Sequence, residues 1–144
     1  MSIDARIVDE IKKIVGEEDV RTSPEERRCY YYDARLDGPM PDLIVFPQSA
    51  EEISRILVLA NAHKFPVIPR GQGSGLTGGS VPIQGGVVLS MMKMNRILQI
   101  DTENLIAVVE PGVVTFVLHQ EVAKKGLMYP PDPASQKYSS IGGN

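Results

Sequence analysis

Twelve residues near the middle of the chain carry the clearest chemical signal. The run 69–80 contains five glycines and three short hydroxyl side chains, those of Ser74, Thr77 and Ser80. Glycine adopts positive φ at no steric cost and places no side chain in front of its own amide. Successive N–H groups of such a loop can converge on one point and bind the oxygens of a phosphate. The run therefore favours phosphate binding over a plain structural connection between two strands.

Two common nucleotide motifs compete for this loop. Residues 73–78 match the dinucleotide fingerprint Gly-x-Gly-x-x-Gly, and Asp101 lies downstream at roughly the 20-residue spacing that the fingerprint expects. The fingerprint must open a helix, however, and residues 80–86 contain a proline and two glycines that do not allow one. No Gly-Lys-Ser/Thr follows the glycines, which excludes a P-loop. We therefore expect an anion held by loop amides rather than by a helix N-terminus.

Charge is unevenly distributed along the chain. The formal net charge of −3 argues against a general nucleic-acid binder. The segment 53–100 nevertheless contains no acidic residue, and its charges alone do not say whether it receives an anion or simply has few charges. Its five basic residues are Arg55, Lys64, Arg70, Lys93 and Arg96.

Length and composition fit one folded unit. The chain has 144 residues, of which 42% are hydrophobic and 23% are charged, close to globular averages. A single cysteine, Cys29, allows no intrachain disulfide, and neither an apolar run of membrane-spanning length nor a signal peptide is present. We expect a cytoplasmic protein without a metal site, in which Cys29 is packed and His63 and His119 are solvated or at the edge of a core.

Short helices and strands must position the loop. Apolar spacing predicts a helix over 4–15 that ends at Gly16, and Ser23 can begin another short helix. A strand is expected at 43–46. A capping box of Ser49 and Glu52 then begins the helix that the sequence indicates most clearly. The apolar face of that helix consists of Ile53, Ile56, Leu57 and Ala60.

The second half of the chain is expected to contain more strands than helices. A strand at 67–68 leads directly into the glycine run, and another follows at 87–89. Residues 101–104 form a natural hairpin turn between strands 97–100 and 105–109. Thr115 can cap a helix that continues to Lys125, and residues 130–133 cannot be helical. Met91 and Met94 are expected to fill the core rather than to bind a cofactor.

Four motifs in order resemble the FAD-linked oxidases of the vanillyl-alcohol oxidase/PCMH-type superfamily, and within it the D subunit of glycolate oxidase and the D-lactate dehydrogenases. The motifs are residues 41–47 with the capped helix, 66–79, 109–113 and 129–144. The resemblance implies an α+β fold, a PCMH-type FAD-binding domain. Its N-terminal αβ subdomain has a small mixed sheet flanked by helices, followed by the start of the second subdomain. It implies a helical lead-in at 1–38 and an FAD-binding domain at 39–144 that is incomplete at its C-terminus.

The resemblance also implies a non-covalent FAD, because Ser74 stands where some relatives attach the flavin through a histidine. The glycine loop would wrap the pyrophosphate with its amides, a role that the acid-free segment supports, and the last motif would line the flavin. The implied cofactor-binding residues are Pro69, Arg70, Gly71, Gln72, Gly73, Ser74, Gly75, Thr77, Gly78 and Gly79 in the first segment, and Pro131, Asp132, Pro133, Ser140, Ile141, Gly142, Gly143 and Asn144 in the second.

The activity implied by the resemblance is FAD-dependent oxidation of a small 2-hydroxy acid of the glycolate or D-lactate type. The substrate would bind to a domain that this chain lacks, so we expect no catalytic residue here, no turnover by this fragment alone and weakened flavin affinity. Electron-transfer subunits would be partners and could hold the protein at the inner membrane. The alternative is a stand-alone nucleotide- or anion-binding module without catalytic activity.

Overall fold

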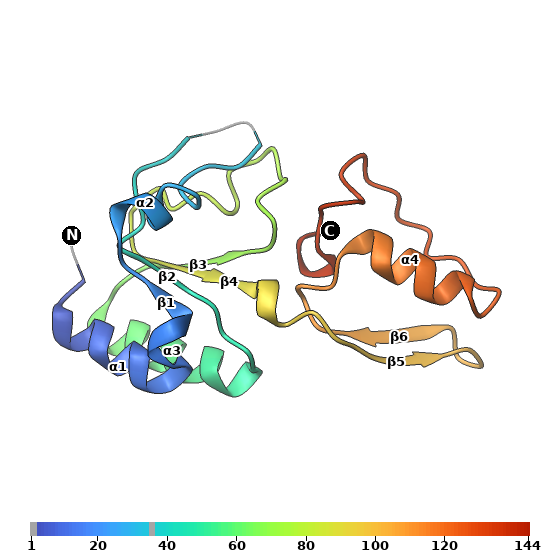
Figure 1. The fold of residues 1–144 in the computed structure, drawn as a ribbon, viewed down its shortest axis with the longest axis horizontal. Coiled ribbons are helices and arrows are strands. Elements are labelled where there is room, and N and C mark those ends of the chain that lie inside the picture. The colour runs from blue at the N-terminus through green and yellow to red at the C-terminus, as the bar shows by residue number, and fades with distance from the viewer. Residues whose placement is uncertain (1–2, 35–36) are drawn as a thin grey trace.

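A four-stranded sheet forms the centre of the N-terminal part of the protein (Figure 1). The computed structural model describes residues 3–34 and 37–144. The strand order is β1-β2-β4-β3, in which β1 is antiparallel to β2 while β2, β4 and β3 are parallel. The α+β class with a small mixed sheet is confirmed. The strands are β1 (Val20–Arg21), β2 (Leu43–Val45), β3 (Val67–Arg70) and β4 (Val87–Ser90).

Each helix of this part begins at a short polar cap, and the sequence predicts two of these caps, Ser23 and Ser49. Asp4 caps α1 (Ala5–Val15), which ends at Gly16. Ser23 caps the short α2 (Pro24–Arg27), and Ser49 caps α3 (Ala50–His63). The Glu52 carboxylate accepts from the amide of Gln48, one residue before the cap, at 2.7 Å. Short 3-10 helices lie at Glu17–Asp19, Met91–Lys93 and Ile141–Gly143.

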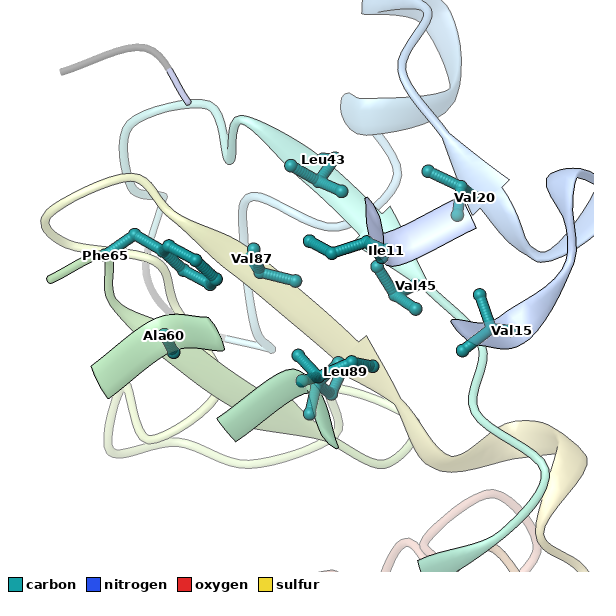
Figure 2. Packing of buried hydrophobic residues seen from close by; sticks show 10 residues of the cluster. Ile11, Val15, Val20, Leu43, Val45, Ala60, Phe65, Val87 and Leu89 are labelled. Carbon is teal, nitrogen blue, oxygen red and sulfur yellow. The ribbon is translucent and has the colours of Figure 1, made fainter. Parts of the chain in front are cut away.

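One apolar core packs α1 and α3 against the sheet, as Figure 2 shows. Ile11 of α1 and Ile56 of α3 are fully buried in it, so part of the segment expected as a lead-in packs with the strands that follow. Leu57 was expected in this core, but it is 43% exposed. The buried stripe of α3 is centred near Ile56, and Leu57 lies about 100° further around the helix, at the margin of the stripe.

The other face of the sheet is also buried. Ile44 and Val88, whose side chains alternate with those in the core just described, have no exposed surface. In Figure 1, α2 and the loops before β2 and after β3 lie on this side, opposite α1 and α3. The glycine run leaves β3 on this side of the sheet, and its residues 71–80 are half-buried or exposed.

The C-terminal part has a hairpin and one helix. β5 (Ile97–Asp101) pairs antiparallel with β6 (Ile106–Val109) through the predicted turn, and α4 (Thr115–Ala123) packs a second core around Val113 and Leu118. The prediction that Thr115 caps α4 is wrong, since Val114 occupies that position. The buried Thr115 hydroxyl instead lies 3.1 Å from the Ser139 carbonyl, a distant partner that replaces the local one.

An ion pair fixes the base of the hairpin and makes stability there depend on pH. The Glu110 carboxylate accepts from the Arg96 amide at 2.8 Å and from its guanidinium at 2.6 Å. These hydrogen bonds lower the pKa of Glu110 below its ordinary value of 4.5. The stabilisation is therefore complete above pH 4.5 and disappears as the pH falls through the lower, folded-state pKa.

We expect Glu110→Gln to be less stable than the wild type at neutral pH, and the difference to shrink once the pH drops below 4.5. Urea unfolding at a series of pH values, from pH 7 down to the lowest pH at which the protein is still folded, measures this difference in unfolding free energy. Glu103→Gln, which removes an exposed carboxylate from the same hairpin, is expected to follow the wild type. A difference between Glu110→Gln and the wild type that stays constant over this range would contradict the assignment.

Candidate functional site

The glycine run and the C-terminal turn face each other across an open cleft of about 410 Å³. The run leaves β3 at the carboxyl end of a parallel strand, a common place for ligand sites in such sheets. No helix follows it before β4, as the sequence predicts. The residues that line the cleft are Ile53, Pro69, Arg70, Gly71, Gln72, Gly73, Ser74, Gly75, Thr77, Gly79, Ser80, Met91, Pro111, Ser139, Ser140, Gly142 and Gly143.

Most of the site residues expected from the sequence lie on this cleft, including Ser140, Gly142 and Gly143 from the last motif. Six expected residues do not line it. Of these, Gly78 belongs to the same loop, and Ile141 packs on the second core. The others are Asn144, whose amide donates to the Thr115 hydroxyl at 2.7 Å, and the exposed or half-exposed Pro131, Asp132 and Pro133.

Five lining residues were not among those expected. Pro111 and Ser139 belong to or adjoin motifs that the sequence already marked, and Ser80 is one of the three loop hydroxyls. Met91 packs against the first core as expected but also reaches the cleft. Ile53 carries no signal beyond its place on the apolar face of α3.

The glycines of the loop have different roles. Gly73 has a φ of +70°, and a Cβ there would lie 2.0 Å from Arg70 Nη2. A Cβ on Gly71 would lie 2.1 Å from Ser140 Oγ across the cleft. A Cβ on Gly75 or Gly79 would meet no atom within 4 Å. The first two glycines therefore allow the chain to pack, and the last two leave open space where a side chain would stand.

The C-terminal turn is bound to the segment that begins α4. The amide of Ile141 donates to Val113 at 2.8 Å, and that of Gly142 donates to Pro111 at 2.9 Å. A Cβ on Gly142 would lie 2.6 Å from Pro111 Cβ, so this glycine is required for the packing of the turn itself. The two sequence motifs that contain these residues thus form one wall of the cleft.

Arg70 lies beneath the loop rather than on its surface. It is 5% exposed, and its guanidinium donates to the Tyr32 carbonyl at 2.6 Å. The rings of Tyr30 and Tyr32 lie 5.6 and 5.9 Å from its Cζ, within cation–π range. Burial lowers the pKa of Arg70, and it also raises the pKa of Tyr30.

The acid-free segment does not form one positive surface. Lys93 is paired with the buried Asp19, and Arg96 is paired with Glu110. Arg55 and Lys64 line two other cavities. Of the five basic residues only Arg70 lines this cleft. The number of basic residues in the segment therefore gives no support to anion binding. Spacing along the chain did not show that the acidic partners of two of them come from other segments.

The remaining candidate residues take no part in this cleft. His63 is exposed, and His119 is hydrogen-bonded to the Pro131 carbonyl at 2.9 Å, as expected for solvated or core-edge histidines. Cys29 was expected to be packed, but it is exposed in the turn that follows α2. Asp101 accepts the amides of its own hairpin turn and does not approach the glycines.

Residues 3–34 and 37–144 contain neither a metal-binding cluster nor a membrane-spanning helix. Among these residues no three His, Cys, Asp or Glu side chains gather where they could hold a metal ion. Within the same residues no helix has the length and apolar character needed to span a bilayer.

The glycine loop that follows β3 is not succeeded by the helix that a dinucleotide fingerprint requires, so the fold lies outside the Rossmann class. Residues 41–144 match the family described as the FAD binding domain, and the chain belongs to that family.

Three curated relatives are named as oxidases or dehydrogenases of hydroxy acids. The chain is 45% identical over 139 residues to glycolate oxidase subunit GlcD of Bacillus subtilis, covering 96% of the chain and 30% of the relative. It is 40% identical to a D-lactate dehydrogenase of Anaerostipes hadrus, covering 91% of the chain and 26% of the relative. It is 41% identical to a D-2-hydroxyglutarate dehydrogenase of Stutzerimonas stutzeri, covering 98% and 31%. The chain thus spans less than a third of each.

Solved structures share the fold. Alkyldihydroxyacetonephosphate synthase superposes with a TM-score of 0.88 at 26% identity, over 99% of this chain and 29% of that one. p-Cresol methylhydroxylase superposes with a TM-score of 0.85 at 24% identity, over 96% and 28%, and at that identity it supports the fold alone. The likeness agrees with the PCMH-type fold that the sequence resemblance implies.

Proposed function

We propose that this chain is the FAD-binding part of a flavin-dependent oxidoreductase that oxidises a 2-hydroxy acid of the glycolate or D-lactate type. The observation that carries the proposal is the open space before Gly75 and Gly79, two glycines of the loop that leaves β3 and lines the cleft. Because no side chain of the loop fills this space, backbone amides are free to approach a charged group closely.

The pyrophosphate of FAD is assigned to the glycine loop, residues 70–79, and the flavin to the opposite turn. Backbone N–H groups of the loop would hold the phosphate oxygens, with the hydroxyls of Ser74, Thr77 and Ser80 beside them. Ser139, Ser140 and Gly143 would contact the flavin from the other wall. For Pro131, Asp132 and Pro133, which lie outside the cleft, a contact with the cofactor stays a prediction.

The wider assignment follows the names of the relatives. FAD supplies the hydride-accepting chemistry, so the protein's part is to bind and orient it. Residues that bind the hydroxy acid would lie in the two thirds of the relatives that this chain does not span. A non-covalent flavin, a boundary near residue 38, electron-transfer partners and a cytoplasmic or membrane-peripheral location complete the proposal.

Flavin titration tests the proposal. The purified chain is titrated with FAD and with riboflavin, which lacks the pyrophosphate, and binding is followed by quenching of flavin fluorescence. Saturable FAD binding at least tenfold tighter than riboflavin binding is expected. Acid precipitation should then leave the flavin in the supernatant, because Ser74 offers no histidine for attachment. Equal affinity for both flavins would contradict the pyrophosphate assignment, and absence of FAD binding would contradict the proposal.

Filling the open space should block the cofactor without harming the fold. We expect Gly79→Leu to weaken FAD binding at least tenfold while its unfolding free energy stays within about 0.5 kcal/mol of the wild type. A side chain there starts in space free of other atoms within 4 Å. Thr102→Leu, in the exposed hairpin turn, adds the same apolar group away from the cleft and should leave both values unchanged. Unaltered FAD affinity in a folded Gly79→Leu would place the ligand elsewhere.

A further inference from the structure

We propose that residues 30–34 form a clamp that sets the shape of the glycine loop before any ligand binds, with Asp33 and Arg70 as its positioning residues. The clamp precedes residues 41–144, the region matched by the FAD-binding family. This proposal rests on the proposed function, because it explains how the same loop is prepared for a pyrophosphate.

Two hydrogen bonds join the clamp directly to the loop backbone. The Asp33 carboxylate accepts from the amide of Gly78 at 2.8 Å, across 45 positions of sequence. The amide of Ala34 donates to the Gly75 carbonyl at 3.1 Å. Asp33 is 5% exposed, so its bond to the loop is largely protected from water. These contacts fix the loop on both sides of Leu76 and Thr77.

Arg70 fixes the start of the loop to the same segment. Its Nη1 donates to the Tyr32 carbonyl at 2.6 Å and to the Ser80 hydroxyl at 3.4 Å, so one guanidinium contacts both the clamp and the end of the loop. Two tyrosine rings of the clamp lie within 6 Å of its Cζ. The absence of a Cβ on Gly73 leaves room for the guanidinium.

These contacts matter because a run of five glycines is costly to order. Glycine loses more backbone freedom on folding than any other residue, and a loop that becomes ordered only on binding loses affinity accordingly. A loop that is already fixed avoids that cost. The Gly78 amide is also already engaged by Asp33, so the phosphate oxygens would be bound by the other amides of the loop.

A pair of Asp33 variants separates positioning from charge. Asp33→Asn keeps an acceptor oxygen for the Gly78 amide and should hold FAD affinity within about threefold of the wild type. Asp33→Ala removes the acceptor and should weaken FAD binding about tenfold or more. Asp9→Ala, which removes an exposed carboxylate on α1, is the control and should leave FAD affinity unchanged. Affinity is measured by the same FAD fluorescence titration.

Hydrogen–deuterium exchange without FAD supplies a readout that does not depend on the cofactor. Amides of residues 71–80 should exchange faster in Asp33→Ala than in the wild type or Asp33→Asn, while those of β5 and β6 should not change. If the wild type binds no FAD but the loop still loosens in Asp33→Ala, the proposed function fails and the clamp stands. If Asp33→Ala folds and leaves both exchange and FAD affinity unchanged, the clamp is overturned.

Should Asp33→Ala not fold, Arg70→Lys tests the clamp in the same way. Lysine keeps the positive charge but lacks the planar guanidinium that spans the Tyr32 carbonyl and Ser80. Faster exchange of the loop amides, with about tenfold weaker FAD binding, supports the clamp. Wild-type values for both would overturn it, because the remaining charge would then be sufficient.

Discussion

Gly73→Ala is expected to abolish measurable FAD binding by this chain. Its backbone has a φ of +70°, which costs an alanine roughly 1 kcal/mol. The new Cβ would also lie 2.0 Å from Arg70 Nη2 and 2.4 Å from its Cζ. That guanidinium cannot move away cheaply, because it is buried between two tyrosine rings, and overpacking of this kind costs about 1 to 3 kcal/mol. The loop must therefore leave its shape or expel Arg70.

Gly75→Ala is the matched control for this prediction. It makes the same substitution two residues further along the same loop, where a Cβ would meet no atom within 4 Å and φ is not positive. FAD titration and thermal unfolding should show Gly73→Ala impaired in both, and Gly75→Ala close to the wild type in stability. A Gly73→Ala variant with the affinity and stability of the wild type would show that the loop tolerates another shape.

Gly112→Ala is expected to have the largest effect on stability. Its Cβ would lie 2.0 Å from the Met91 carbonyl oxygen and 2.7 Å from that of Met94, and neither is the end of a flexible side chain. The Gly112 amide also donates to Met94 at 2.7 Å, so the backbone cannot retreat without losing a buried hydrogen bond. We expect a loss of about 3 kcal/mol or more, measured by urea unfolding.

Gly126→Ala gives the reference for this loss. Gly126 has a φ of +72° but open space around its Cβ position, so alanine there should cost about 1 kcal/mol from backbone strain alone. The excess of Gly112→Ala over Gly126→Ala measures the clash with the segment after β4. Equal losses would show that Met91 and Met94 shift to accommodate the methyl group.

Local signals in the sequence predicted the elements and the glycine loop. Ser23 and Ser49 cap their helices because a short side chain bonds to an amide three residues away, a relation that the sequence contains directly. The loop was recognised for a similar reason, since the freedom of glycine belongs to the residue itself. The family resemblance then supplied the order of the motifs, which the match to residues 41–144 confirms.

Pairings between distant segments could not be predicted in this way. Thr115 looked like a cap because its partner Ser139 lies 24 positions away, and nothing local marks that contact. The positive segment looked continuous because the partners of Lys93 and Arg96 lie in other elements. The clamp was missed for the same reason, since Asp33 and Gly78 are joined only in the folded chain.

The two walls of the cleft come from parts with separate cores, one around β2 and β4 and the other around Val113 and Leu118. A dinucleotide bound between them would contact both parts at once and would act as a cross-link between two units that have separate cores. Its binding free energy would then add to the cooperativity of the whole chain, since a ligand that requires both walls stabilises only the state in which both are folded. In this respect the cofactor would be a structural component of the domain.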